Sequence, residues 1–289
     1  MKIVDFSLEQ GNKYFGRVDG KRFLIGTRVP YKGLKGLRNL SGTVAQRYDP
    51  ADFRAAHGFW ADFLAPTAAA EGALFHTLNT YDRARFTFAF LQFAAHVPNG
   101  DFVRYVRALL KLPLAAEYFP DLELVNGRIC RIKDPGAAPV PLESDQSTAG
   151  LMDYLNPSAA EVEDTEVIQA AKFVHWVQND PEHRRVQIEC GVANFRQALV
   201  SYARRYGLDG ADDAVCLVVA DIRHQGRANS AAIVVALASP KPLDALLQIG
   251  EPEYHARLLT LRGEIGKSVA DGFLGTRKYS LAKKDFVPR

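Results

Sequence analysis

The most informative part of the sequence is EGALFHTLNTYDRARFTFAFLQ, residues 71–92. It places Glu71 near an expected helix end, Asp82 beyond a loop, and Thr87 and Gln92 in an extended segment. Glycoside hydrolysis uses two carboxyl groups in such a layout. One stays protonated in an apolar setting and protonates the leaving oxygen, while the ionised one holds a water. Short polar side chains on a nearby strand can hydrogen-bond that water. The pattern therefore favours glycosidase chemistry.

A helix is expected before this stretch, from about Pro50, because apolar residues recur there at helical spacing and Asp52 can cap it. Pro66 either kinks this helix or opens a new one, since proline is tolerated only in a first helical turn. We favour a new helix from Pro66 to about Thr77, which would place Glu71 inside it.

Within the stretch, Arg85 to Phe93 alternates, which predicts a strand. Phe86, Phe88 and Phe90 share one face and are expected in the core rather than on a sugar-stacking surface. Further helices are expected at 101–112, 158–179, 191–206, 212–222, 228–238, 240–248 and 251–270. Residues 231–238 could form a strand, but their alanine content and context favour a buried helix.

The N-terminal 50 residues are expected to form a separate β-rich extension, with Asp19-Gly20 as a hairpin turn. Eight basic residues and one acidic residue lie between Arg17 and Arg47. This bias indicates either a solvated face or a contact surface for an anionic polymer. Residues 51–289 would form the main domain. It would contain a linker-like loop at 133–150, and the acidic residues of 143–166 would be solvated.

Composition excludes several classes of protein. The chain has 289 residues, 47% of them hydrophobic, and a net charge of +3, so a globular core is expected and no general argument for nucleic acid arises. Cys130, Cys190 and Cys216 are too few and too far apart for a disulfide framework. Nucleotide-binding, serine-hydrolase and HExxH motifs are absent, so neither a cofactor nor a metal site is expected. The longest apolar run is too short for a membrane span, and the N-terminus does not resemble a signal peptide.

The segment DRARFTFAF, which begins at Asp82, resembles the Asp-Gly-Arg-Gly-Tyr-Thr-Ala-Gly segment of the family 46 chitosanases, members of the lysozyme superfamily. The resemblance implies that Asp82 is the general base, that Thr87 helps to hold the attacking water, and that the upstream Glu71 is the general acid. Its ending, FAFLQ, looks like a segment of lytic transglycosylases and phage lysozymes, which would make Gln92 a cleft residue.

Two later segments resemble chitosanase helices in the same order. Residues 199–226 imply that Asp221 and His224 contact the substrate, or else orient neighbouring groups or cap a helix. Residues 253–262 imply that Arg262 contacts the substrate or pairs with a buried carboxylate that braces the site. The chain departs from the family where Arg83 and Arg85 replace glycines and where Ala89 stands in place of the usual glycine. Arg85 is itself a candidate substrate ligand, or an ion-pair partner for Asp82.

Together these observations predict an α+β, mainly α-helical, lysozyme-like two-lobed fold with a small β-hairpin at the active site. The expected function is a glycoside hydrolase that cleaves a β-1,4-linked aminosugar polymer, with a lytic transglycosylase as a close variant. Peptidoglycan suits the basic N-terminal segment and is favoured. Cationic chitosan suits the acidic 143–166 segment.

A chain of this kind is expected to be cytoplasmic as made, and to reach a cell wall through phage lysis or a secretion system. An inhibitor or immunity protein would then be a partner. Two alternatives remain: a non-catalytic lysozyme-like glycan-binding or structural module, and a helical regulatory protein whose basic N-terminus binds nucleic acid.

Overall fold

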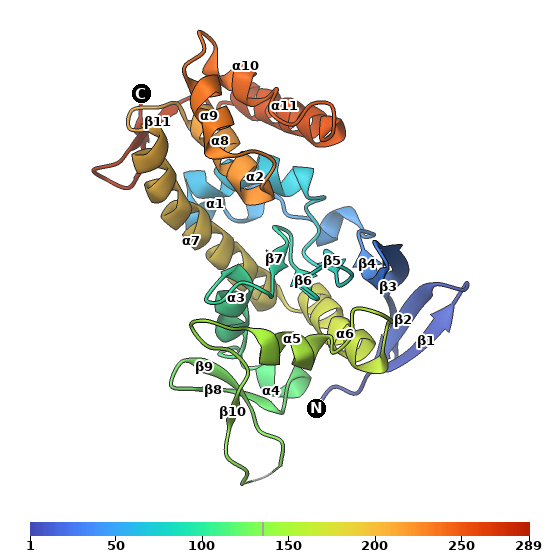
Figure 1. The fold of residues 1–289 in the computed structure, drawn as a ribbon. Coiled ribbons are helices and arrows are strands. Elements are labelled where there is room, and N and C mark those ends of the chain that lie inside the picture. The colour runs from blue at the N-terminus through green and yellow to red at the C-terminus, as the bar shows by residue number, and fades with distance from the viewer. Residues whose placement is uncertain (135) are drawn as a thin grey trace. The chain divides into compact units, whose positions relative to one another are not determined.

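The computed structural model describes residues 1–134 and 136–289 and shows an α+β protein (Figure 1). The described residues are 44% helical and 19% strand, which confirms the predicted class. The chain divides into two compact units, each built from two separate segments. The first comprises Met1–Arg47 and Leu74–Cys190, and the second comprises Tyr48–Ala73 and Gly191–Arg289. The long helix α7 (Pro181–Tyr206) contributes residues to both units.

An antiparallel sheet forms the centre of the first unit, and its seven described strands follow one another in sequence order. The predicted turn at Asp19-Gly20 is confirmed, because both residues adopt the positive φ that a two-residue hairpin turn requires, +50° and +75°. The strands are β1 (Asp5–Glu9), β2 (Lys13–Val18), β3 (Lys21–Tyr31), β4 (Leu34–Asn39), β5 (Leu78–Asn79), β6 (Thr87–Phe88) and β7 (Phe93–Ala94).

The N-terminal strands belong to this sheet, so the predicted domain boundary at residue 50 does not match the division in the structure. Strand β4 pairs with β5 through Arg38 with Asn79 and Asn39 with Leu78. Strand β4 is paired on both sides, with β3 and β5, so it cannot be separated from either neighbour without breaking backbone hydrogen bonds. The first 47 residues are therefore one wall of the unit that holds Asp82, rather than an appended module.

The predicted strand at 85–93 is much shorter than expected. Arg85 and Ala89 have φ of +56° and +86°, a left-handed conformation that interrupts an extended chain and leaves only β6 and β7. The three phenylalanines of the predicted inner face are nevertheless fully buried, which confirms their place in the core; they are Phe86, Phe88 and Phe90.

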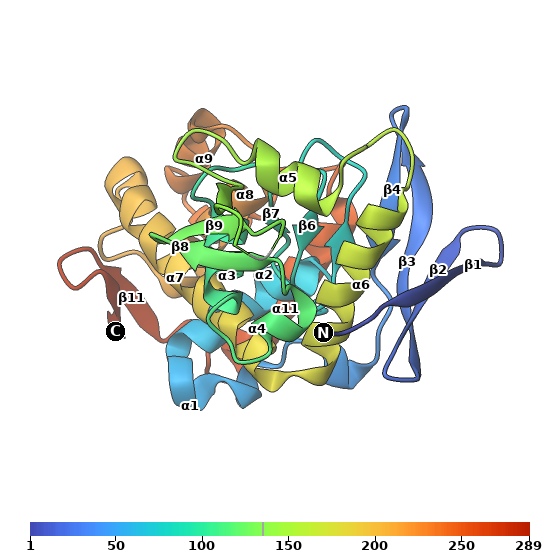
Figure 2. The same ribbon diagram turned by 90° about the horizontal axis from the view of Figure 1, so that it is seen from below.

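The rest of the first unit packs around the sheet, with α6 running alongside β2 and β3 (Figure 2). The predicted linker-like loop at 133–150 is irregular over most of its described residues, and residue 135 lies outside them. It is nevertheless attached to the unit, because β10 pairs with β9 and Glu143 is buried against Arg107 and Arg128. The prediction of a solvated acidic stretch fails at Glu143 and also at Glu166, which is buried. The elements are η1 (Val44–Gln46), α3 (Asp101–Leu109), α4 (Ala115–Tyr118), β8 (Leu122–Val125), β9 (Arg128–Arg131), β10 (Val140–Pro141), α5 (Ala149–Leu155) and α6 (Asp164–Asn179).

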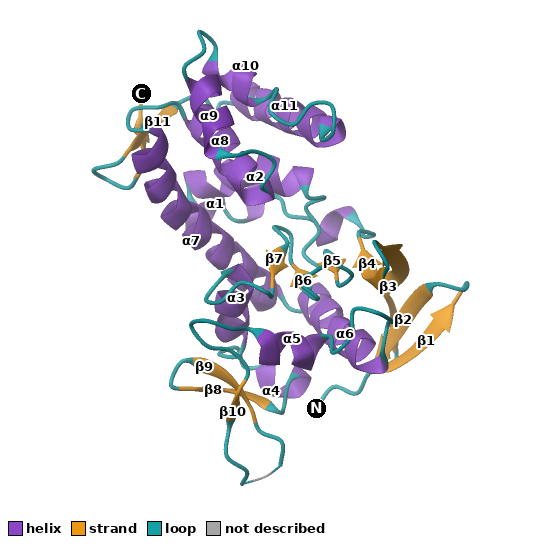
Figure 3. Cartoon of the chain, viewed as in Figure 1, coloured by secondary structure: helices purple, strands orange, loops and turns teal. Residues whose placement is uncertain are grey.

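The second unit consists mostly of helices (Figure 3). Helix α2 contacts α8 and α11, and a short hairpin of two strands completes the unit. The elements are η2 (Pro50–Asp52), α1 (Arg54–His57), α2 (Phe59–Ala70), α8 (Asp213–Gln225), α9 (Ser230–Leu237), α10 (Pro242–Leu246), α11 (His255–Ala270), β11 (Arg277–Ser280) and β12 (Asp285–Pro288).

Two helix predictions for this unit need correction. Helix α2 continues through Pro66 and ends at Ala70, so no new helix begins at the proline. Proline costs the helix one backbone hydrogen bond, but the helix is buried on both sides of it, and that burial outweighs the loss. Helix α9 is present but only partly buried, since Ile233 and Ala236 are buried whereas Val234 and Val235 are 52% and 73% exposed. Among the described residues, no helix is both long and apolar enough to cross a bilayer.

Candidate functional site

Glu71 lies at the end of helix α2 rather than inside a helix. The chain turns sharply after it, because Gly72 adopts a φ of +92°. The amide of Gly72 donates to the carbonyl of Ala69 at 2.9 Å, and the amide of Ala73 donates to that of Ala68 at 2.7 Å. This pair of bonds is a Schellman motif, the usual glycine-dependent end of a helix. It holds the backbone of Glu71 in one position.

The Glu71 carboxylate belongs to a chain of ion pairs within the second unit. Arg257 on α11 donates to Glu71 at 2.5 Å and to Asp221 on α8 at 2.7 Å. Arg227, just beyond α8, donates to the other Asp221 oxygen at 2.6 Å. The exposed fraction of the side chains falls along this series of ion pairs, from 13% for Glu71 to none for Asp221 and Arg227. The cluster holds two positive and two negative groups, so it fixes the position of Glu71 without adding net charge.

The electrostatics of the cluster follow from burial and charge pairing. Burial raises the pKa of Asp221, but Arg257 and Arg227 outweigh this effect and hold the pKa below its ordinary value. Burial lowers the pKa of Arg257, and the two carboxylates beside it raise it by more. Asp221 is therefore an ionised, buried anchor for Arg257. This is the orienting role that the sequence left open for Asp221.

Neither Arg257 nor Arg227 was predicted from the sequence. For Arg262 the sequence left substrate contact and bracing of a buried carboxylate open, but Arg262 donates to the Leu247 carbonyl at 2.7 Å and pairs with the partly exposed Glu251. The available signal was that Arg257 occupies the same expected helix as Arg262. His224 lies at the end of α8 with its ring centre 5.4 Å from that of Phe195. That contact is aromatic packing within the second unit.

A hollow of about 530 Å³ lies in the first unit and brings together Asp82, Thr87 and Gln92, three of the residues singled out from the sequence. Asp82 accepts a hydrogen bond from the Asn79 amide group at 3.0 Å and another from the Ala84 backbone amide at 2.8 Å. Each carboxylate oxygen thus has one donor and keeps a further lone pair. The other residues that line the hollow are Tyr31, Lys32, Leu34, Arg83, Ala84, Ala94 and His96.

Arg85 does not line this hollow, although it was a candidate substrate ligand. Its guanidinium donates to the Asn156 carbonyl at 2.9 and 2.6 Å and pairs with Asp153 at 2.8 Å. The Asn156 side chain returns a hydrogen bond to the Arg85 carbonyl at 2.9 Å. These contacts clamp the loop that follows Asp82, so Arg85 supports the position of Asp82 through the backbone.

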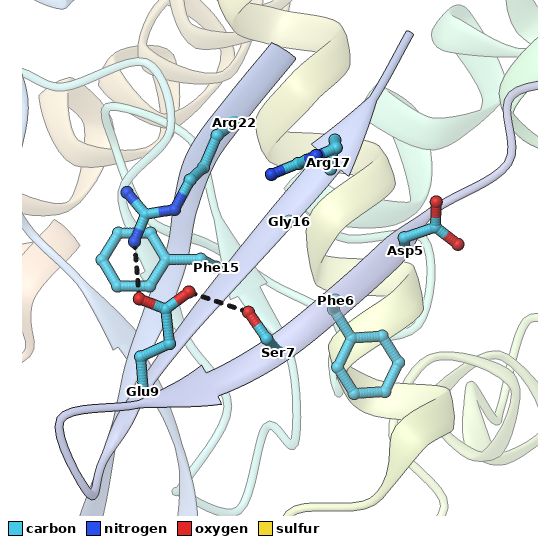
Figure 4. Close-up of a pocket in the computed structure, with 8 residues that line it drawn as sticks. All are labelled: Asp5, Phe6, Ser7, Glu9, Phe15, Gly16, Arg17 and Arg22. Atoms are coloured by element: carbon cyan, nitrogen blue, oxygen red, sulfur yellow. Dashed lines mark hydrogen bonds and ion pairs between the residues drawn. The ribbon is translucent and has the colours of Figure 1, made fainter. Parts of the chain in front are cut away.

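A second, smaller hollow lies between strands β1, β2 and β3 (Figure 4). The Arg22 guanidinium stacks 3.6 Å from the centre of the Phe15 ring and donates to Glu9 at 2.7 Å. Ser7 also donates to Glu9, at 2.9 Å. These groups satisfy one another, so the hollow beside Asp82 is the better candidate for a ligand site.

The predicted residues therefore form two groups. Glu71 and Asp221 share the ion-pair chain of the second unit, whereas Asp82, Thr87 and Gln92 share the hollow of the first. Comparison with protein-family models, with curated proteins and with solved structures finds no match to the chain.

Proposed function

We propose that the chain is a lysozyme-like glycoside hydrolase that cleaves a β-1,4-linked aminosugar polymer, with peptidoglycan favoured over chitosan. The observation that carries the proposal is the hollow shared by Asp82, Thr87 and Gln92. In the sequence, resemblance to the chitosanases singles out Asp82 and Thr87, and resemblance to lytic transglycosylases and phage lysozymes singles out Gln92. Their gathering around one solvent-accessible space is what a water-activating site requires.

In this proposal Asp82 takes a proton from the attacking water. Its oxygens accept hydrogen bonds from the Asn79 side chain and the Ala84 backbone amide, and they keep lone pairs for the water. Thr87 lines the same hollow and can position that water through its hydroxyl group. A lytic transglycosylase needs no activated water, so in that variant Asp82 would matter less.

Glu71 is proposed as the proton donor to the leaving oxygen. The ion pair with Arg257 holds its carboxylate in place at rest. Arg257 has a second partner in Asp221, so it can keep one ion pair when Glu71 takes up a proton. The arrangement thus offers a carboxyl group of fixed position whose counter-ion has an alternative partner.

The backbone beside Asp82 also supports the resemblance. Arg85 and Ala89, which stand where the chitosanase pattern has glycine, both adopt positive φ. Glycine is the residue that normally occupies this conformation. The chain thus has the backbone shape that the family's glycines suit, although it lacks the glycines.

The test is glycan release from purified peptidoglycan and from chitosan by the wild type, Glu71→Gln and Asp82→Asn. The exposed Glu253→Gln serves as a matched control for carboxylate removal. We expect both site variants to lose at least about 100-fold in rate, since an acid or a base contributes 10²–10⁴-fold. Circular dichroism of each variant establishes that it is folded. Loss in Glu71→Gln alone, with anhydro-sugar products, would indicate a transglycosylase.

A non-catalytic glycan-binding module is the second candidate. The observation that favours it is the ion pair of Glu71 with Arg257, because carboxylates in such pairs often serve structure alone. Absence of release by the folded wild type from either polymer, together with retention on insoluble peptidoglycan, would support this module and contradict the hydrolase.

A further inference from the structure

The β3–β4 turn forms one wall of the hollow beside Asp82. Strand β3 ends at Tyr31 and β4 begins at Leu34, and these two residues pair across a turn of only two residues. Lys32 and Gly33 in that turn have φ of +50° and +83°. A two-residue turn of this kind is rigid, so it presents Lys32 in a defined place. Tyr31, Lys32 and Leu34 all line the hollow.

An exposed aromatic surface accompanies the turn. The Tyr31 side chain is 43% exposed, and its ring centre lies 5.4 Å from that of Tyr81 at an angle of 50°. The Lys32 ammonium group lies 5.3 Å from the Tyr31 ring centre. Tyrosine combines an apolar ring face with a polar edge, which suits it to contact the apolar face of a pyranose ring.

The charges around the hollow are unbalanced. Among the described residues, neither Lys32 nor Arg83 makes an ion pair with a carboxylate, whereas nearby Lys35 pairs with Glu161. Asp82 is the one acidic residue among those that line the hollow. Burial lowers the pKa of the lining His96 and Arg83 lowers it further, which together outweigh the effect of Asp82 and disfavour a positive charge on the imidazole. The hollow therefore favours an anionic ligand over a cationic one.

We propose that Tyr31, Lys32 and Arg83 form a subsite for an acidic sugar. Tyr31 contacts the ring, and the two cations bind a carboxylate attached to it. The inference rests on the proposed function, which it deepens by naming the substrate class: a β-1,4-linked glycan that carries carboxylates. It also assigns a role to the N-terminal strands, which become part of the substrate site.

The test is isothermal titration of the full chain carrying Glu71→Gln, so that no probe is hydrolysed. The probes are three tetrasaccharides with the same β-1,4 backbone and different charges: alternating N-acetylglucosamine and N-acetylmuramic acid, N-acetylglucosamine alone, and glucosamine alone. We expect the acidic probe to bind best and the cationic probe worst. Added salt should weaken binding of the acidic probe and leave the neutral one unchanged.

Lys32→Asn removes the charge and keeps the turn, because asparagine tolerates positive φ. It should weaken binding of the acidic probe about tenfold and leave the neutral probe unchanged, in line with loss of one charge-assisted contact. Arg83→Gln should act in the same direction, and Tyr31→Ala should weaken all three probes. Lys21→Asn, at an exposed position at the other end of β3, is the control and should change nothing.

Equal binding of the acidic and neutral probes, or no effect of Lys32→Asn on the acidic one, would overturn the inference. Glycan release by the wild type together with that result would leave the proposed function standing. Charge-dependent binding without glycan release would do the reverse: the subsite would stand and the hydrolase would fail.

Discussion

Asp221 and Arg227 form an ion pair in which both side chains are completely buried, with 2.6 Å between a carboxylate oxygen and a guanidinium nitrogen. Asp221 also holds Arg257, and Arg257 holds Glu71. Removing one partner from a buried pair leaves an uncompensated charge in the interior, which costs more than the pair itself contributes. Asp221 is thus the residue on which the arrangement around Glu71 depends.

Asp221→Asn should lower the free energy of unfolding by about 3–5 kcal/mol at pH 7, because it leaves the buried Arg227 without a countercharge and Arg257 with Glu71 alone. Urea denaturation measures this loss. The control is Glu253→Gln, an exposed carboxylate-to-amide change that should stay within about 0.5 kcal/mol of the wild type. A loss in Asp221→Asn as small as that of the control would show that the cluster does not contribute to stability.

Ala89→Gly should be nearly neutral, although Ala89 is fully buried. Its φ of +86° costs an L-residue about 1–2 kcal/mol, which glycine avoids. That gain offsets two losses, the burial of the methyl group and the greater freedom of glycine in the unfolded chain. Together these losses also amount to about 1–2 kcal/mol. The comparison is Ala61→Gly, a buried alanine in α2 where no strain is relieved. In thermal melts, Ala61→Gly should be clearly the less stable; equal melting temperatures would contradict the strain at Ala89.

The structure could be predicted from the sequence where neighbouring residues alone determine the backbone conformation. The turn at Asp19-Gly20 was predictable because a two-residue hairpin turn needs positive φ at both positions. The path of α2 through Pro66 was not predictable from the sequence, because burial along α2 overrides the helix-breaking preference of proline. The turns at Arg85 and Ala89 were hidden because neither residue type signals positive φ.

The same distinction holds for the candidate site. Asp82 and Thr87 are neighbours in sequence, so a local motif was enough to group them around one hollow. The pairing of Arg257 with Glu71 joins helices that are distant in sequence, and only tertiary packing determines which arginine of α11 reaches the carboxylate. Sequence periodicity placed Arg257 and Arg262 on the same helix without distinguishing them.

Glu143→Gln should destabilise the protein by about 3 kcal/mol at pH 7, the low end for a broken buried pair, since its partners Arg107 and Arg128 remain partly exposed. Burial raises the pKa of Glu143, but the hydrogen bonds from Arg107 and the Ile129 amide outweigh it and lower the pKa. The contribution of ionised Glu143 to stability is therefore present above about pH 4.5 and is lost as the pH falls further.

Urea denaturation between pH 3 and pH 7 measures this dependence. The difference between wild type and Glu143→Gln should shrink as the solution is acidified. The exposed Glu123→Gln is the control and should follow the wild type throughout. A difference that is independent of pH would contradict an ionised Glu143 in the folded state.

Glu166 has the opposite pH dependence, because no described cation forms an ion pair with it to offset its burial. Its carboxyl group is fully buried at the start of α6. One oxygen accepts hydrogen bonds from the Thr80 hydroxyl and from the Leu37 amide, and the other has no partner among the described residues. Burial raises the pKa of Glu166 from 4.5 to about 7.

Stability should therefore fall as the pH rises from about 4.5 to 7, because the folded chain keeps a proton that the unfolded chain releases. The shift corresponds to about 3 kcal/mol. Glu166→Gln retains an acceptor oxygen for Thr80 and Leu37 but cannot ionise, so it should lack this decline and exceed the wild type in stability at pH 8. Denaturation of both proteins from pH 4 to pH 8 isolates the effect, since their difference cancels the other titrating groups. Parallel curves would show that Glu166 is ionised in the folded protein and that its burial is balanced by contacts other than these two hydrogen bonds.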